Sequence, residues 1–323
     1  MIVGQDAAID AFFRAWRGGT PHHAWLLSGP RGVGKASFAK AAATRILAEG
    51  AGQKIDLPPP AVPSDSQTVS MMEAGSHPDF RLLTREMNDR KTAQKRNISV
   101  DQVRSIATFL GITPSLSPWR VILIDSADDL EAGGANALLK MLEEPPENTI
   151  FLLVSHAPGR LLPTIRSRCR RLGFQPLGDD VMASLLAEHC PEMEATGRQA
   201  LIDLSQGSIG RALALAEMDL LPQVAAARSI MCEGDPTLAR RADLVRSLSN
   251  KANAERYAAF LDMLPAIVAE EVRQADAAQR PALLKAYEEV RRIAATAPRL
   301  SLDPGATVMQ LSSALAHAAP QPA

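Results

Sequence analysis

The sequence has 323 residues, of which 46% are hydrophobic and 22% are charged. This is the composition of an ordinary globular protein of about two or three domains, and it excludes a disordered or fibrous chain. The 35 Lys and Arg residues are balanced by 36 Asp and Glu residues, so the net charge of −1 excludes a strongly basic protein that coats nucleic acid. Any contact with nucleic acid must therefore come from a local patch.

The apolar runs of the sequence are short. Val121–Ile124 and Phe151–Val154 are far below the ~20 apolar residues that a membrane span requires. The first residues include Asp6, Asp10 and Arg14 where a secretory signal would have an apolar core. We therefore expect a cytoplasmic protein with no membrane partner.

The three cysteines do not form a metal-binding pattern. Cys169, Cys190 and Cys232 are 21 and 42 residues apart, and none has a second thiol or a histidine at the short spacing that closes a zinc chelate. We therefore expect no metal site.

Strand-like and helix-like segments alternate through the first half of the chain. The segments typical of strands are Ala24–Ser28, Asp79–Thr84, Arg120–Ile124, Thr149–Ser155 and Arg170–Phe174. The segments typical of helices are Lys35–Ala48, Val100–Leu110 with Ser99 as its N-cap, and Ala135–Leu142. This alternation predicts a mostly parallel sheet that is covered by helices.

Two segments of the first half read as loops. Lys54–Met72 contains Pro58-Pro59-Pro60, Pro63 and several serines, a composition that favours an extended or disordered loop inserted into the domain. Asp89–Asn97 is polar and basic, and we expect it to project as a loop ahead of the Ser99 cap.

After Pro176 the strand signals end, and the segment from Asp179 to Ala319 is rich in Ala and Leu at helical spacing. Gly207 and Gly210 interrupt this pattern, which suggests a short bundle to about Met218 and a second helical domain beyond it. We therefore expect an α/β domain at 1–176, a small helical domain at 177–218 and a C-terminal all-α domain at 219–323.

A glycine-rich loop follows the first predicted strand. Gly29, Gly32, Gly34 and Lys35 stand between that strand and a helix, which is the context of a P-loop whose backbone N–H groups and Lys cradle phosphates. A P-loop then places Ser or Thr after the Lys to ligate Mg²⁺, but here the residue is Ala36. Two interpretations remain open: a degenerate phosphate site that binds ATP or ADP, or a glycine-rich turn retained for its shape.

The strand at 120–124 ends in Asp125, as in a Walker B element where the acid supports Mg²⁺. Many such proteins place Glu directly after that Asp to activate water, whereas this chain has Ser126, whose hydroxyl is too weak a base near neutral pH. Together with Ala36, this residue argues against ATP hydrolysis at the site.

Four further motifs, together with the degenerate P-loop, span about 140 residues. The chain resembles the AAA+ clamp-loader family of bacterial DNA polymerase III in these motifs, which are 75–79 (GSHPD), 98–104 (ISVDQVR), 136–146 (NALLKMLEEPP) and 164–169 (TIRSRC).

The resemblance implies an α/β P-loop (AAA+) domain with a parallel sheet, a small helical lid and a C-terminal all-α collar that joins the subunits of the loader. It also implies a subunit of the polymerase holoenzyme that organises the loader in DNA replication and does not hydrolyse ATP itself. Its expected partners are the gamma/tau and delta subunits, with the sliding clamp and primed DNA reached through the complex.

By the same resemblance, Arg168 in Ser-Arg-Cys is an arginine finger that reaches the γ-phosphate of ATP bound by a neighbouring subunit. A guanidinium suits this role because it is always charged and its donors fork toward phosphate oxygens. Without the neighbouring motifs, Arg166–Arg171 would read as a basic surface run at the start of a strand. Ser155 and Arg211 match the polar sensor and the sensor arginine of the family, and with a degenerate site both could equally be packing residues.

The insertion departs from the family, because many relatives carry four zinc-binding cysteines at 51–74 and this chain has none. We therefore expect no zinc there. One alternative function is an active, gamma/tau-like ATPase with an unusual metal arrangement at Asp125. Another is an inert DNA-binding adaptor that uses the cations Arg81, Arg85, Arg90, Lys91, Lys95 and Arg96. No aromatic residue is present among them to stack bases, which favours a solvated loop.

Overall fold

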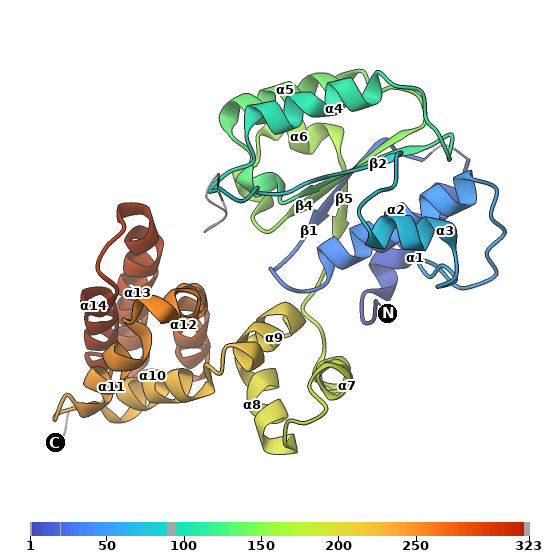
Figure 1. Ribbon diagram of the computed structural model, residues 1–323. Coiled ribbons are helices and arrows are strands. Elements are labelled where there is room, and N and C mark those ends of the chain that lie inside the picture. Colours follow the sequence, from blue (N-terminus) through green and yellow to red (C-terminus); the bar gives the residue numbers. More distant parts are fainter. Residues whose placement is uncertain (1, 20, 89–94, 320–323) are drawn as a thin grey trace. The chain divides into compact units, whose positions relative to one another are not determined.

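The computed structural model describes residues 2–19, 21–88 and 95–319 (Figure 1). Within it the chain forms two compact units. The first consists of Met1–Ser184 with Gln206–Gly210, and the second of Leu185–Ser205 with Arg211–Ala323. The expectation that 177–218 forms a domain of its own stays a prediction.

The first unit is built on a parallel sheet, as the alternation of strands and helices predicts. Its five described strands, in the spatial order β2-β3-β4-β1-β5, are β1 (Ala24–Ser28), β2 (Phe80–Leu83), β3 (Arg120–Asp125), β4 (Thr149–Ser155) and β5 (Arg170–Gly173). Every described pair of neighbouring strands is parallel. All residues of the neighbouring strands β1 and β4 are buried, because helices cover both faces of a parallel sheet.

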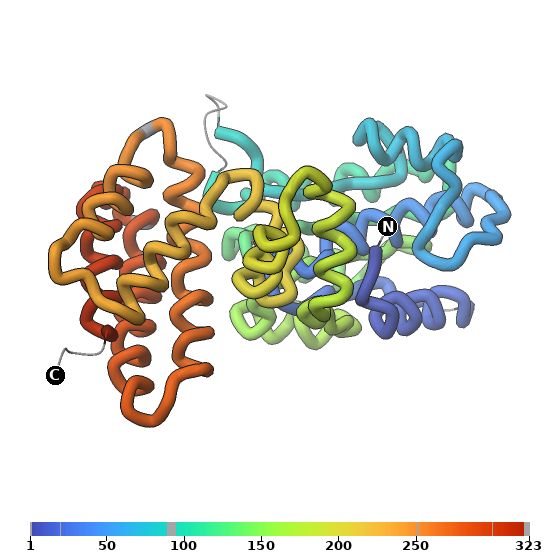
Figure 2. The backbone as a smooth tube through the Cα atoms, turned by 90° about the horizontal axis from the view of Figure 1, so that it is seen from below, coloured from blue at the N-terminus to red at the C-terminus, as the bar shows by residue number. Residues whose placement is uncertain are grey.

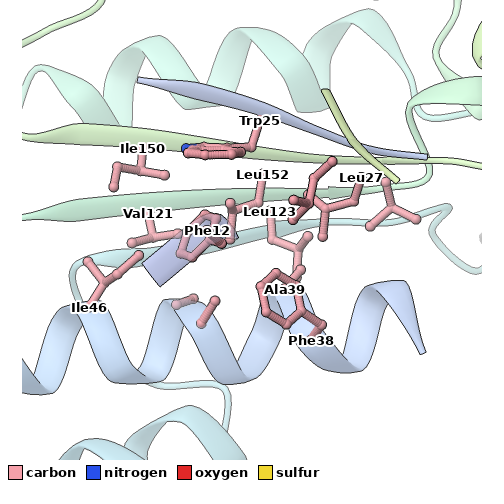
Figure 3. Close-up of a cluster of buried hydrophobic side chains, with 14 of the residues drawn as sticks. Phe12, Trp25, Leu27, Phe38, Ala39, Ile46, Val121, Leu123, Ile150 and Leu152 are labelled. Carbon is pink, nitrogen blue, oxygen red and sulfur yellow. The ribbon is translucent and has the colours of Figure 1, made fainter. Parts of the chain in front are cut away.

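Helices lie on both faces of the sheet (Figure 1). One face carries α1 (Asp6–Arg17), α2 (Lys35–Gly50) and α3 (Gln67–Glu73), and the other carries α4 (Val100–Leu110), α5 (Ala132–Glu143) and α6 (Pro163–Arg168). Figure 3 shows the core of the first face, where the ring of Phe12 contacts both Trp25 of β1 and Phe38 of α2. Sequence analysis assigned no structure to α1, although its buried Phe12 and Phe13 hold it to the sheet.

The predicted start of α4 is confirmed. The N–H of Gln102 donates to the Ser99 hydroxyl at 3.3 Å, and the Ser99 N–H donates to the Gln102 side chain at 3.0 Å. This reciprocal pair satisfies two of the N–H groups that the first turn of a helix leaves without an intrahelical acceptor.

The insertion at 54–72 is irregular over residues 54–66, as its composition predicts, but its last part is helical. This part is α3, in which Thr68 and Met72 are buried. The insertion is bound to α2 by Arg45, which is only 1% exposed. The Arg45 guanidinium donates to the carbonyls of Ile55, Leu57 and Ala61 at 3.0, 3.0 and 2.6 Å, respectively. A buried guanidinium can organise a proline-rich loop by collecting its carbonyl oxygens, a long-range contact that local composition does not reveal.

The Asp79 of the 75–79 motif has a structural role. Its buried carboxylate accepts the backbone N–H groups of Ser115, Leu116 and Ser117 at 2.7, 2.8 and 2.9 Å. It thereby holds the loop between α4 and β3, whose backbone N–H groups would otherwise be left without partners.

After Pro176 the described chain is helical, as predicted. The helices are α7 (Asp179–His189), α8 (Ala195–Ser205), α9 (Ile209–Glu217), α10 (Leu221–Glu233), α11 (Ala239–Leu248), α12 (Ala254–Gln274), α13 (Arg280–Leu300) and α14 (Pro304–Ala316). In the second unit the long helices α12 and α13 lie side by side (Figure 2). Among the described residues, no helix combines the length and apolar character that would let it cross a membrane.

Candidate functional site

Most of the predicted site residues of the first unit lie at one edge of the sheet. The glycine-rich loop follows β1, Asp125 ends β3 and Ser155 ends β4. Ser28 of β1 pairs in register with Ser155, and Asp125 pairs with Val154. Because the carboxyl ends of neighbouring parallel strands meet at the same edge, the topology brings these residues together, as in other α/β sites.

The glycine-rich loop has the backbone of a P-loop. Gly34 is the N-cap of α2 and has a φ of +96°, in the left-handed region that a side chain rarely adopts. Gly29 lies against β5, where a Cβ atom would be 2.3 Å from the carbonyl oxygen of Phe174. The shape of the loop therefore depends on glycine at both positions.

Lys35 is turned toward its own loop. Its ammonium donates to the carbonyl oxygens of Gly29, at 2.7 Å, and Pro30, and the residue is 3% exposed. Burial lowers the pKa of Lys35 to about 8, while the carboxylates of Asp125 and Asp128 favour its charged form. The lysine that a P-loop directs at phosphates is engaged here by the carbonyls of the loop itself.

The donor set does not fit a hydrolysable Mg²⁺-nucleotide. A P-loop site supports Mg²⁺ with the residue after the Lys and with the acid at the end of β3. Ala36, in the first turn of α2, contributes no oxygen, so of this pair only Asp125 can do so. Burial raises the pKa of Asp125, although His156 and Lys35 favour its ionised form. Ser126 stands at the position where a water-activating acid is expected. Its hydroxyl donates to the carboxylate of Asp129 at 3.1 Å.

Asp128 has a role that no pattern in the sequence predicts. Its carboxylate accepts the Ser155 hydroxyl at 2.9 Å and the backbone N–H groups of His156 and Ala157 at 2.6 and 3.2 Å. The predicted sensor Ser155 is therefore held by a carboxylate from the turn after β3. Asp128 and Asp129 are adjacent in the sequence, and no local pattern shows which of the two carboxylates would bind Ser155.

A short segment after α8 lies on the glycine-rich loop. The Ser208 hydroxyl donates to the carbonyl of Arg31 at 2.9 Å. The Gly207 carbonyl accepts the N–H of Leu177 at 2.9 Å, just beyond β5. Residues 206–210 thus belong to the first compact unit, although they follow a helix of the second.

Arg168 is the last residue of α6, and the predicted strand begins two residues later, as β5 at Arg170. One terminal nitrogen of Arg168 donates to the carbonyl of Thr164 at 3.0 Å. The other forms an ion pair with Glu143, the last residue of α5, at 2.7 Å. The Arg168 side chain is 34% exposed.

Arg170 and Arg171, which follow Arg168, contact side chains of the neighbouring strand β1. The Arg170 guanidinium lies over the Trp25 ring, 5.0 Å from its centroid, and Arg171 donates to the Ser28 hydroxyl at 2.9 Å. Both strand arginines are therefore used within the fold, whereas Arg168 stands on a helix end.

Arg211 lies in α9, in the second compact unit. Burial lowers the pKa of its guanidinium, and Asp262 of α12 opposes that shift. The proposed sensor role of this arginine stays a prediction.

Three described cations of the predicted DNA-binding patch have partners within the fold. Arg85 pairs with Asp129 and Lys95 pairs with Glu86, each at 3.4 Å, and Arg81 lies over the ring of Phe109. Two members of the patch, Arg90 and Lys91, lie outside the described residues. Among the described residues, no group of three or more His, Cys, Asp or Glu side chains could hold a metal ion.

The chain is similar in sequence to a family of known proteins. A family model described as DNA polymerase III, delta subunit, matches residues 4–178. The DNA polymerase III subunit delta-prime of Pseudomonas aeruginosa is 36% identical over 186 residues, which are 58% of this chain and 53% of that protein. The Escherichia coli subunit delta-prime is 32% identical over 206 residues, 64% of this chain and 58% of that protein.

The DNA polymerase III subunit gamma of Buchnera aphidicola is also similar, with 31% identity over 221 residues, 67% of this chain and 56% of that protein. The matched part of the chain thus spans little more than half the length of these three relatives.

Proposed function

The chain belongs to the DNA polymerase III delta-subunit family, and we propose that it is a clamp-loader subunit that does not hydrolyse ATP and supplies Arg168 to the ATP site of a neighbouring subunit. In this proposal the AAA+ domain at 1–176 presents the finger, a lid at 177–218 follows it, and the collar at 219–323 joins the other subunits. The proposed partners are the gamma/tau and delta subunits, and the complex acts on the sliding clamp and primed DNA in the cytoplasm.

The observation that carries the proposal is the contrast between Lys35 and Arg168. Lys35 is buried against the carbonyls of its own loop, and Ala36 beside it offers no metal ligand. Arg168 is held at the end of α6 with a third of its side chain exposed. The chain therefore retains a presented guanidinium and lacks the groups that its own site would need for hydrolysis.

A guanidinium in this position can act on a neighbour's nucleotide without chemistry of its own. When a γ-phosphoryl group is transferred, negative charge spreads over its oxygens, and a fixed positive group there stabilises the transition state. Fingers of this kind are worth ~10³–10⁵ in rate, which is roughly 4–7 kcal/mol at 1.36 kcal/mol per decade.

The proposal is tested on the loader reconstituted from this chain and its partner subunits. Arg168→Ala should assemble normally, since a partly exposed arginine at a helix end contributes little to its own domain's core. ATP turnover stimulated by clamp and primed DNA should fall by about 100-fold at the site that Arg168 serves, with other ATP sites diluting the total loss. Arg168→Lys should fail nearly as badly, because a point charge does not reproduce the planar fork. Wild-type turnover by a fully assembled Arg168→Ala complex would remove the finger role.

A second candidate function is an active ATPase of the gamma/tau type, and the similarity to a relative named as a gamma subunit favours it. Ala36 and Ser126 are the residues that argue against it, because a hydrolysing site needs a metal ligand and a water-activating acid at these positions. Binding of ATP or ADP is compatible with both functions, whereas binding without hydrolysis fits only the first.

A further inference from the structure

The ion pair between Arg168 and Glu143 joins the predicted finger to the 136–146 motif, which has so far been given no function. Glu143 ends α5 in the 136–146 motif, and Arg168 ends α6 in the 164–169 motif. The carboxylate comes from a different helix and is 25 residues distant in the chain, so the contact joins the two helix ends in space. Glu143 is itself 48% exposed and does not serve to fill the core.

The position of Glu143 is unfavourable for its own helix. A negative charge at a helix C-terminus opposes the helix dipole, whereas the positive charge of Arg168 at the end of α6 is favoured. The guanidinium of Arg168 offsets the cost of the Glu143 carboxylate, which gives this acid a role outside α5.

The two contacts of Arg168 fix the guanidinium from two sides. One terminal nitrogen donates to the Thr164 carbonyl at 3.0 Å, and the other donates to Glu143 at 2.7 Å. A guanidinium has five N–H donors, so these two contacts leave three for another acceptor. An arginine with a single backbone contact would sample several rotamers, and a finger that must meet a phosphate loses rate steeply with misplacement.

We propose that Glu143 is a positioning residue that braces the Arg168 guanidinium so that its remaining donors face the γ-phosphate of the neighbouring subunit's ATP. This inference rests on the proposed function of Arg168. Glu143 touches no substrate in it and acts only through the arginine. The competing arrangement is a latch, in which Glu143 holds the guanidinium away from the nucleotide and slows the reaction.

The test compares Glu143→Ala and Glu143→Gln in the reconstituted loader, with Glu144→Ala as the matched control. Glu144 is the adjacent exposed acid, and its side chain has no hydrogen bond or ion pair in the described part of the chain. Glu143→Ala should lower the kcat of clamp- and DNA-stimulated ATP hydrolysis by about three- to tenfold with KM unchanged, because the brace acts in the transition state. Glu143→Gln retains an acceptor oxygen and should recover most of that loss. Glu144→Ala should match the wild type.

The same variants are then made in the Arg168→Ala background, where Glu143→Ala should have no further effect because the residue that it braces is gone. A wild-type rate for Glu143→Ala, or the same loss in both backgrounds, would overturn the brace. A higher rate for both Glu143 variants would replace the brace with the latch. If Arg168→Ala itself leaves turnover unchanged, the finger role fails, and that outcome is distinguishable from the failure of the brace alone.

Discussion

The backbone N–H of Gly210 donates to the carbonyl oxygen of Gly32 at 2.9 Å, so the start of α9 is bonded to the middle of the glycine-rich loop. A Cβ atom on Gly210 would lie 2.9 Å from the Cα atom of Gly32, closer than such atoms approach in proteins. The two backbones meet directly, and neither can give way as the end of a flexible side chain would. In this protein the loop serves as a packing surface for residues 206–210.

Gly210→Ala should therefore destabilise the chain by about 1–2 kcal/mol, even though alanine favours a helix over glycine by nearly 1 kcal/mol. Urea unfolding of the isolated chain measures the change. Gly159→Ala is the control, because a Cβ atom at Gly159 meets nothing within 4 Å and the residue is not in the left-handed region. Equal unfolding free energies for Gly210→Ala and wild type would show that the loop yields at no cost.

Arg45→Met should destabilise the chain by about 3 kcal/mol or more, because it removes the buried donor that the carbonyls of the insertion share and leaves Glu49 without its ion-pair partner. Limited proteolysis should also cut the insertion at 51–66 faster. Lys40→Met, at an exposed position on the same helix, should stay within about 0.5 kcal/mol of wild type.

Metal analysis extends this prediction to the expected absence of zinc. We expect no bound zinc in the purified chain, and added zinc should not restore the stability of Arg45→Met. One zinc ion per chain, or restored stability of Arg45→Met on addition of zinc, would contradict the claim that Arg45 organises the insertion without a metal.

The lowered pKa of Lys35 predicts a pH dependence of stability. The pKa is about 8 in the folded chain and 10.5 when exposed, so between these values the unfolded chain binds the proton more tightly. The free energy of unfolding of wild type relative to Lys35→Met should therefore rise with pH across this window, by at most about 1.4 kcal/mol per pH unit. Urea unfolding of both proteins at pH 8, 9 and 10 measures it. A difference that does not change with pH would show that Lys35 keeps an ordinary pKa.

The isolated chain should hydrolyse no ATP above background, because Ala36 and Ser126 replace the groups that position metal and water. The double variant Ala36→Thr with Ser126→Glu should bind nucleotide more tightly but still turn over poorly alone, since catalysis also needs a partner's arginine. Steady-state phosphate release and nucleotide titration measure the two effects. Steady turnover by the wild-type chain that is lost in Lys35→Ala would favour the active ATPase instead.

Local sequence patterns were sufficient for the sheet, for three of the six described helices that cover it (α2, α4 and α5) and for the helical second half. The strands are continuous apolar runs because a parallel sheet is buried on both faces, and the start of α4 is marked by Ser99 and Gln102, which are three residues apart. The edge at which Lys35, Asp125 and Ser155 meet also follows from the order of strands and loops along the chain. The resemblance of four motifs singled out Arg168 as the predicted finger, which no periodicity could have distinguished from Arg170.

Tertiary structure decided what these residues touch. Arg45 collects carbonyls from ten to sixteen positions away, Asp128 in the turn after β3 holds Ser155 of β4, and Glu143 reaches Arg168 from a different helix. Each contact depends on how a charged side chain finds acceptors or donors after the chain has folded. A sequence pattern records which residues are buried at regular spacing, but it does not record the partner of a polar group, because that partner is set by packing between elements distant in sequence.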